Sequence, residues 1–63
     1  MTADWVGDWF AYNGAGELIG CVDARWTKTI RAAAREFPTA ARIELVTDFD
    51  ERHRLLTIMA GVA

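Results

Sequence analysis

The side chains best suited to chemistry lie late in the chain, where acidic residues surround its one histidine. Asp48, Asp50, Glu51 and His53 carry the oxygen and nitrogen donors that metal ions bind. Calcium loops, however, need more oxygen ligands and a glycine at their sharp turn, and transition-metal sites usually use several histidines or cysteines. We therefore expect a solvated acidic turn here, and neither a metal nor any other cofactor.

Three features have residue types that active sites use but lack the surroundings that such a site needs. Gly14, Gly16 and Gly20 form a glycine-rich stretch, but it is one residue longer than a dinucleotide-binding loop and leads into a strand-like run. The single cysteine, Cys21, excludes intramolecular disulfides and lies in that apolar run, which favours a buried side chain over a nucleophile. His53 has no serine or cysteine close to it in sequence. These patterns predict that the protein is not an enzyme.

Positive charge is concentrated in one stretch of the chain. Residues 1–24 sum to −4, residues 25–42 to +4 and residues 43–63 to −2. The central cations can dock on an acidic protein surface, neutralise nucleic-acid phosphates, or pair with the domain's own acids. A net charge of −2 counts against nucleic acid. The candidate partner-binding cations are Arg25, Lys28, Arg31 and Arg35.

Two early tryptophans form a second candidate surface. Trp5 and Trp9 precede the point at which the first pair of predicted strands is complete. Tryptophan dominates many binding interfaces because it buries a large area. We prefer packing of both rings into the core, and a partner-binding surface is the alternative.

A helix is expected to present these cations. Asp23 is a suitable N-cap, and Pro38 predicts that the helix ends at about residue 36. With 100° per residue, one apolar stripe faces the core and the cations lie on the opposite side. The residues of that stripe are Trp26, Ile30, Ala33 and Phe37.

Strands are expected on both sides of this helix. Residues 9–12 and 18–22 are strand-like, and Asn13-Gly14 between them predicts a β-hairpin. Residues 42–47 alternate between polar and apolar, as a half-buried strand does.

The last segment has two interpretations. Thr57 and Ile58 are β-branched and favour a strand over residues 54–59. Asp48 and Glu51 have capping-box spacing, which instead favours a helix with Phe49, Leu56 and Ala60 on one face and Gly61 as its stop. We prefer the strand. The predicted fold is a single α+β domain over residues 1–63, ββαββ, with a small antiparallel-rich sheet and one amphipathic helix on one face; ββαβα is the second choice.

One helix cannot cover both faces of such a sheet. Trp9 and Phe10 are neighbours in a strand and therefore point to opposite faces. Some aromatic surface is expected to be exposed, to be covered by the terminal segments, or to be buried in a homodimer.

The chain is expected to be cytoplasmic. Its first ten residues lack the basic start and apolar run of a signal peptide. The longest weakly polar stretch, Leu55 to Ala63, is far shorter than the roughly 20 residues that span a bilayer. An unpaired cysteine fits a reducing compartment.

In size, predicted ββαββ layout, lack of catalytic groups and Ala/Arg-rich composition, the chain resembles the small phage-encoded inhibitors that include anti-CRISPR proteins. The resemblance implies a stoichiometric inhibitor of a host nucleoprotein complex, such as a CRISPR–Cas effector, in the host cytoplasm, and it carries over no site residues. We therefore expect a non-enzymatic protein-binding module. The alternative is a small nucleic-acid-binding regulator that uses the four cations.

Overall fold

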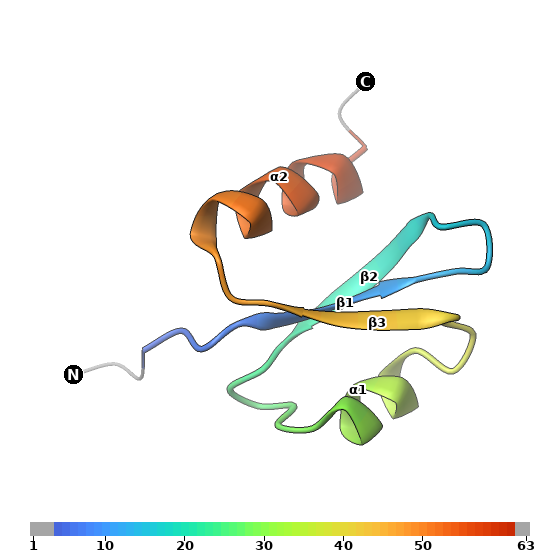
Figure 1. The fold of residues 1–63 in the computed structure, drawn as a ribbon, viewed down its shortest axis with the longest axis horizontal. Coiled ribbons are helices and arrows are strands. Elements are labelled where there is room, and N and C mark those ends of the chain that lie inside the picture. Colours follow the sequence, from blue (N-terminus) through green and yellow to red (C-terminus); the bar gives the residue numbers. More distant parts are fainter. Residues whose placement is uncertain (1–3, 62–63) are drawn as a thin grey trace.

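Three β-strands and two α-helices make up the computed structural model, which describes residues 4–61 (Figure 1). In chain order they are β1 (Asp8–Tyr12), β2 (Leu18–Asp23), α1 (Ile30–Glu36), β3 (Arg42–Val46) and α2 (Phe49–Met59). This confirms the predicted α+β class, the small antiparallel sheet and the strand near residues 42–47. The order is ββαβα, the second of the two predicted orders.

β1 is the central strand of the sheet, whose order is β2-β1-β3. Both neighbours run antiparallel to it, so that Phe10 of β1 lies opposite Cys21 of β2 and Glu44 of β3. The longest-range pairing, between β1 and β3, therefore brings the two halves of the chain together.

The predicted hairpin between β1 and β2 is confirmed, but its turn forms differently. The Asn13 side-chain oxygen accepts hydrogen bonds from the backbone N–H groups of Ala15 and Glu17, both at 2.9 Å. The positive φ of the turn, 82°, falls on Gly16 and not on Gly14. Asn13 thus closes the loop with its side chain, as asparagine often does in turns.

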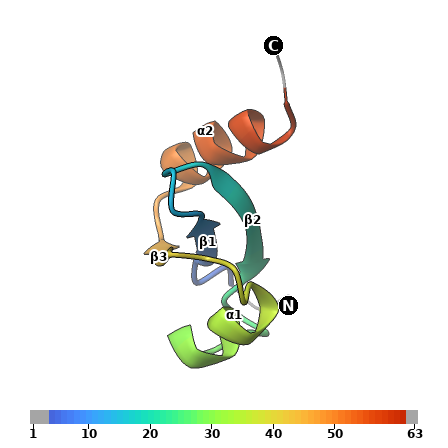
Figure 2. The same ribbon diagram turned by 90° about the vertical axis from the view of Figure 1, so that its right-hand side faces the viewer.

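The two helices lie on opposite sides of the sheet, as Figures 1 and 2 show. Asp8 bonds to Arg52 of α2, whereas Trp9 bonds to the backbone of Thr27, just before α1. Because side chains alternate along a strand, Phe10 shares the α2 side with Asp8. Trp9 and Phe10 therefore point to opposite faces as predicted, but each face has its own helix.

The hydrophobic core is small because the sheet is narrow. Within residues 4–61 the buried apolar side chains are Phe10, Ala11, Ala33 and Leu55. Three strands span only about 10 Å across, and the shortest extent of the Cα trace is 14 Å. A sheet of this width leaves large apolar side chains at the margins exposed to solvent.

Helix α1 begins later than predicted. Asp23 does not cap it: the Asp23 carboxylate accepts from the backbone N–H of Arg25 at 2.8 Å, which closes a turn instead. The N-cap is Thr29, whose hydroxyl accepts from the backbone N–H of Ala32 at 3.1 Å. The last helical residue is Glu36, as the position of Pro38 predicted.

The predicted apolar stripe is half right. Ala33 is buried, and the ring of Phe37 packs so closely on β2 that a Cβ on Gly20 would lie 2.5 Å from it. Trp26 and Ile30, however, are 78% and 56% exposed. Trp26 lies outside the helix, so helical periodicity does not apply to it.

The predicted strand over residues 54–59 is wrong, because this segment belongs to helix α2. The Asp48 carboxylate caps it by accepting from the backbone N–H of Glu51 at 2.8 Å. The hydroxyl of Thr57 donates to the carbonyl of His53, one turn earlier, at 2.9 Å. This bond satisfies the hydroxyl group of Thr57 within the helix. The capping interaction of Asp48 outweighs the strand propensity of the β-branched Thr57.

The face that α2 buries also differs from the helical alternative. Leu55 is the buried residue, whereas Phe49 and Ala60 are exposed. Gly61, with a φ of 72°, follows the helix as expected of a stop.

Candidate functional site

An exposed tryptophan dominates the loop of residues 24–29, which connects β2 to α1. Trp26 lines an open cleft of about 570 Å³ together with Val6, and the residue is 78% exposed. Val6 and, just beyond the loop, Ile30 are more than half exposed. A tryptophan and a valine exposed together in one cleft of a small domain are typical of a binding surface.

A salt bridge fixes the conformation of this loop. The guanidinium Nη2 of Arg25 lies 2.8 Å from the Asp23 carboxylate, and its Nε lies 3.2 Å from both carboxylate oxygens. The carbonyl of Asp23 also accepts from the backbone N–H groups of Trp26 and Thr27, at 3.2 and 3.0 Å. These bonds close the turn that places the indole at the surface.

The same salt bridge shifts the ionisation of both partners. The side-chain and backbone hydrogen bonds from Arg25 lower the pKa of the Asp23 carboxyl. The bond to Asp23 raises the pKa of Arg25. The Arg25 guanidinium carbon is 5.8 Å from the centroid of the Trp26 ring, within cation–π range.

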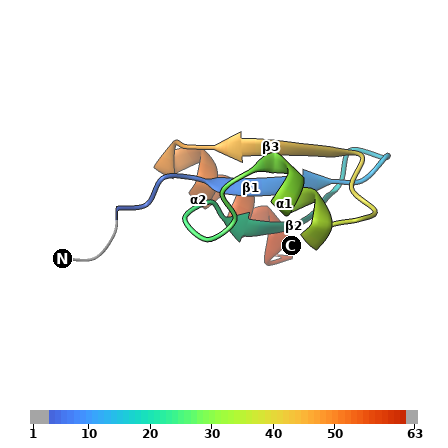
Figure 3. The ribbon, with the colours of Figure 1, turned by 90° about the horizontal axis from the view of Figure 1, so that it is seen from below.

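Three more cations continue from this loop onto the helix. Lys28 lines the cleft, and Arg31 and Arg35 lie one turn apart on α1. Within residues 4–61 no ion pair involves these three side chains. Figure 3 looks onto this side, with α1 and the loop before it in front of the sheet. We call this region the Trp26 surface; it consists of Val6, Arg25, Trp26, Lys28, Ile30, Arg31 and Arg35.

The four predicted cations therefore do not share one helix face. Arg25 and Lys28 lie in the loop, because the helix begins only at Ile30. The structure instead brings Arg25 and Lys28 together around the cleft beside Trp26. The stretch remains basic, but its centre is an aromatic ring.

The two predicted tryptophans are tied into the fold. Trp5 stacks on Phe49 of α2 with a centroid distance of 4.4 Å and donates its indole N–H to Asp8 at 3.0 Å. Trp9 donates its indole N–H to the carbonyl of Thr27 at 2.7 Å. Trp5 therefore lies on the α2 side and Trp9 on the α1 side, and the indole N–H of each is satisfied within the domain.

Sequence reasoning missed Trp26 because it assigned this residue to the buried side of a helix. The signal that identifies it is Thr29, a good N-cap residue in its own right. A helix capped at Thr29 leaves Trp26 in the preceding loop, where no buried face is available to it.

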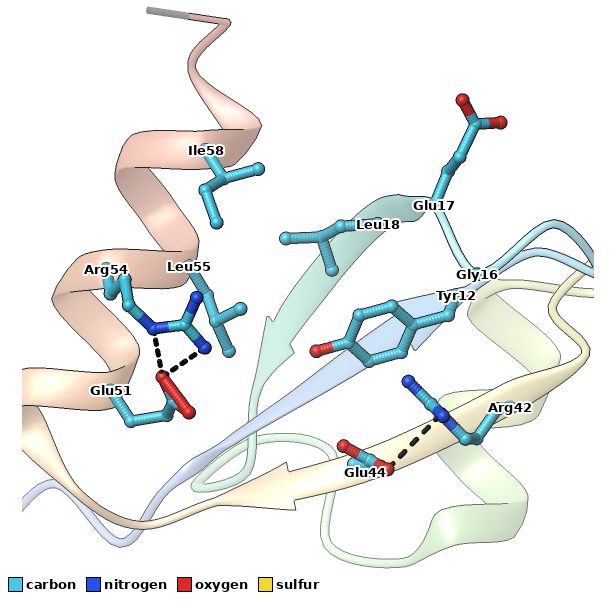
Figure 4. Close-up of a pocket in the computed structure, with 10 residues that line it drawn as sticks. All are labelled: Tyr12, Gly16, Glu17, Leu18, Arg42, Glu44, Glu51, Arg54, Leu55 and Ile58. Atoms are coloured by element: carbon cyan, nitrogen blue, oxygen red, sulfur yellow. Dashed lines mark hydrogen bonds and ion pairs between the residues drawn. The ribbon is translucent and has the colours of Figure 1, made fainter.

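A second, larger cleft lies between α2 and the sheet, with a volume of about 630 Å³. Figure 4 shows Leu55 and Ile58 of α2 facing Leu18 and Tyr12 across it. Four of its charged side chains form two pairs: Arg42 lies 3.2 Å from Glu44, and Arg54 bonds to Glu51. The fifth, Glu17, accepts a hydrogen bond from the side-chain amide of Asn13 at 3.0 Å. The cleft thus has apolar walls and a rim that carries one more carboxylate than cation.

Candidate metal ligands and the single cysteine are the remaining groups that the sequence analysis considered for chemistry. No cluster of three or more histidine, cysteine, aspartate or glutamate side chains is placed to hold a metal ion within residues 4–61. Burial, and secondarily the negative charge of Asp8, raise the pKa of the Cys21 thiol. A raised pKa disfavours the thiolate, which is the nucleophilic form.

Comparison with known proteins adds no family. No family model, curated protein or solved structure matches this chain. None of the helices in the described residues has the length and apolar character needed to cross a bilayer. The Trp26 surface therefore carries the functional inference.

Proposed function

We propose that this chain is a non-enzymatic protein-binding module that engages its target through the Trp26 surface. The exposure of Trp26 carries the proposal: a tryptophan that is 78% exposed, in a cleft that it lines with Val6, is unfavourable in the free domain. Burying it against a partner gains about 25 cal/mol for each Å² of apolar surface removed from water. Tryptophan and arginine are also the residues most enriched among those that dominate binding energy.

Neutralisation of the basic stretch by the domain's own acids is the main competing interpretation. It holds for Arg25, which pairs with Asp23. It does not account for Lys28, Arg31 and Arg35, for which the described residues provide no carboxylate within ion-pair distance. Three such cations beside an apolar patch favour a partner that supplies negative charge.

Blocking a surface of the target by binding to it, without turnover, is the mode of action that fits this module best. The cleft beside Trp26 is present in the free domain, and the single cysteine is poorly suited to act as a nucleophile. Stoichiometric inhibition of a host complex, such as a CRISPR–Cas effector in the host cytoplasm, is the specific form that the resemblance implies. The ββαββ order used for that resemblance is not the observed order, so size, composition and the lack of catalytic groups in the sequence are its remaining basis.

A nucleic-acid-binding regulator is the second candidate. Cations beside an exposed indole are the arrangement by which proteins hold single strands, through phosphate contacts and base stacking. The net charge of −2 and the presence of Asp4 in the same cleft oppose it. Binding to DNA or RNA would weaken steeply and linearly with the logarithm of salt concentration.

Capture from a nuclease-treated lysate of the native cells tests the proposal. The wild-type chain should retain a protein at stoichiometric yield, and Trp26→Ala should lose it. The matched control is Ile58→Ala, because Ile58 is also exposed, at 54%, but lies on α2. If Trp26→Ala retains the partner as well as the wild type does, the proposal is wrong.

A charge reversal tests the helical part of the surface. Arg31→Glu combined with Arg35→Glu should abolish binding and leave the far-ultraviolet circular dichroism spectrum unchanged, because both side chains are exposed on α1. Solution mass measured on the same samples tests the homodimer alternative, in which aromatic surface is buried against a second copy of the chain. Retained binding by the double variant would restrict the surface to the loop.

A further inference from the structure

The cleft beside Trp26 suits an apolar side chain of the partner. Apart from Asp4, Arg25 and Lys28, its walls are made by Val6, Ala24 and the indole ring. Its volume of about 570 Å³ exceeds that of one side chain, so a short segment of the partner fits there. An aliphatic group inserted against the indole would cover the surface that the domain itself leaves exposed.

The charges around the cleft are arranged unequally. Lys28 lies on the wall from which the chain continues into α1, where Arg31 and Arg35 follow. Among the described residues that line the cleft, Asp4 is the one carboxylate. It lies on the segment before β1 and is in no described ion pair. Negative groups of a partner are therefore attracted toward Lys28 and α1 and repelled from the side of Asp4.

From these two features, and resting on the function proposed above, we infer that the Trp26 surface binds an acidic peptide segment of its partner. An aliphatic side chain of the segment enters the cleft against Trp26, and flanking carboxylates contact Lys28 and Arg31. The aliphatic anchor fixes the position of the segment, and the carboxylates select acidic segments over neutral or basic ones.

Protein is favoured over nucleic acid by the aliphatic part of the surface. Base stacking needs an aromatic platform and cations, but it makes no use of the exposed Val6 and Ile30. An acidic peptide with an aliphatic residue contacts all three kinds of group in this surface: aromatic, aliphatic and cationic.

A peptide panel tests the inference on the intact chain. The probe is a short capped peptide, labelled with a fluorophore, in which one leucine is flanked by aspartate and glutamate residues. Two matched peptides replace the leucine by serine, or all the acids by their amides. Labelled oligothymidylate is the nucleic-acid probe, and binding is followed by fluorescence anisotropy at low salt. The protein variants are Trp26→Ala, Lys28→Glu combined with Arg31→Glu, and the control Ile58→Ala.

The acidic leucine peptide should bind best. Each matched peptide, and each of the two surface variants, should weaken binding by about tenfold or more, whereas Ile58→Ala should leave it unchanged. Equal binding of the amide peptide, or full binding by the Lys28/Arg31 variant, would overturn the inference.

Two further outcomes separate the inference from the proposed function. If no peptide binds but a lysate protein is still captured through Trp26, the acidic segment is wrong and the protein-binding function stands. If oligothymidylate binds and the peptides do not, both are wrong and the nucleic-acid alternative replaces them.

Discussion

At the scale of single residues, hydrogen bonding distinguishes the three tryptophans. The indole N–H groups of Trp5 and Trp9 donate to Asp8 and to the carbonyl of Thr27, so both rings can pack against the domain. Trp26 follows the turn closed by Asp23, which directs its ring outward. The same residue type thus has a structural role at two positions, and at the third it is available to a partner.

The contact between Gly20 and Phe37 gives a sharp prediction at this scale. Gly20→Ala should destabilise the domain by about 1–3 kcal/mol, because the added methyl group meets the Phe37 ring at 2.5 Å. Gly14→Ala is the matched control, since nothing lies within 4 Å of a Cβ there and its φ is not positive. Urea denaturation measures both. Equal stability of the two variants would show that Phe37 does not pack on β2.

The thiol of Cys21 gives a second prediction. Since burial and the charge of Asp8 raise its pKa, less thiolate is present near pH 8 than in an unfolded chain. Alkylation by iodoacetamide should therefore be several-fold slower in the folded protein than in the same protein in urea. A rate in the folded protein as fast as that in urea would contradict this.

At the scale of the elements, the sequence was sufficient to predict helices and strands where the local signals agree. The strands around Asn13, the strand near residues 42–47 and the end of α1 before Pro38 were predictable from turn residues, alternation and backbone restriction. It was insufficient where two capping residues competed. Asp23 and Thr29 are both good N-caps, and only the hydrogen bonds of the folded chain show that Asp23 closes a turn while Thr29 begins the helix.

The candidate site was predictable only in part for the same reason. Arg25, Lys28, Arg31 and Arg35 were identified from charge alone, but their placement depended on where α1 begins. Moving that start from the Asp23 region to Ile30 transfers two cations and Trp26 from a helix to a loop. Because the prediction placed the N-cap at Asp23 and not at Thr29, Trp26 was not identified as an exposed residue.

Helix α2 is held to the sheet by a partly buried ion pair, which gives a prediction at this scale. Arg52 donates from Nε to Asp8 at 2.7 Å, and the Asp8 side chain is 5% exposed. Arg52→Met leaves a buried carboxylate without its countercharge and should lower the free energy of unfolding by about 2–3 kcal/mol. The loss is smaller than for a fully buried pair, because Arg52 is partly exposed.

Arg54→Met is the control for that measurement. Arg54 pairs with Glu51 on the exposed part of the same helix and should contribute about 0–1 kcal/mol. Since a domain of this size has a total stability of roughly 3–5 kcal/mol, Arg52→Met should bring it close to unfolding in thermal and urea titrations. Equal effects of the two variants would mean that Asp8 is not protected from water.

At the scale of the whole molecule, a narrow sheet with one helix on each side sets the limit on what can be buried. The chain uses Phe10, Ala11, Ala33 and Leu55 for its core and leaves Trp26 outside it. Its negative net charge coexists with a positive surface, since the central cations lie in the loop before α1 and on α1. A partner with the opposite pattern, apolar at its centre and acidic around it, complements this surface.

The most direct test of this account is the indole region of a ¹H–¹⁵N correlation spectrum, recorded before and after addition of the captured target. The three tryptophans give three indole N–H signals, and that of Trp5, which stacks on Phe49 of α2, serves as the internal control. Binding through the Trp26 surface predicts that the Trp26 signal shifts or broadens, while that of Trp5 keeps its position; the Trp9 signal is expected to respond with Trp26, because its N–H bonds to Thr27 of the same loop. A Trp26 signal unchanged at saturation, with the Trp5 signal shifted instead, would contradict the central claim.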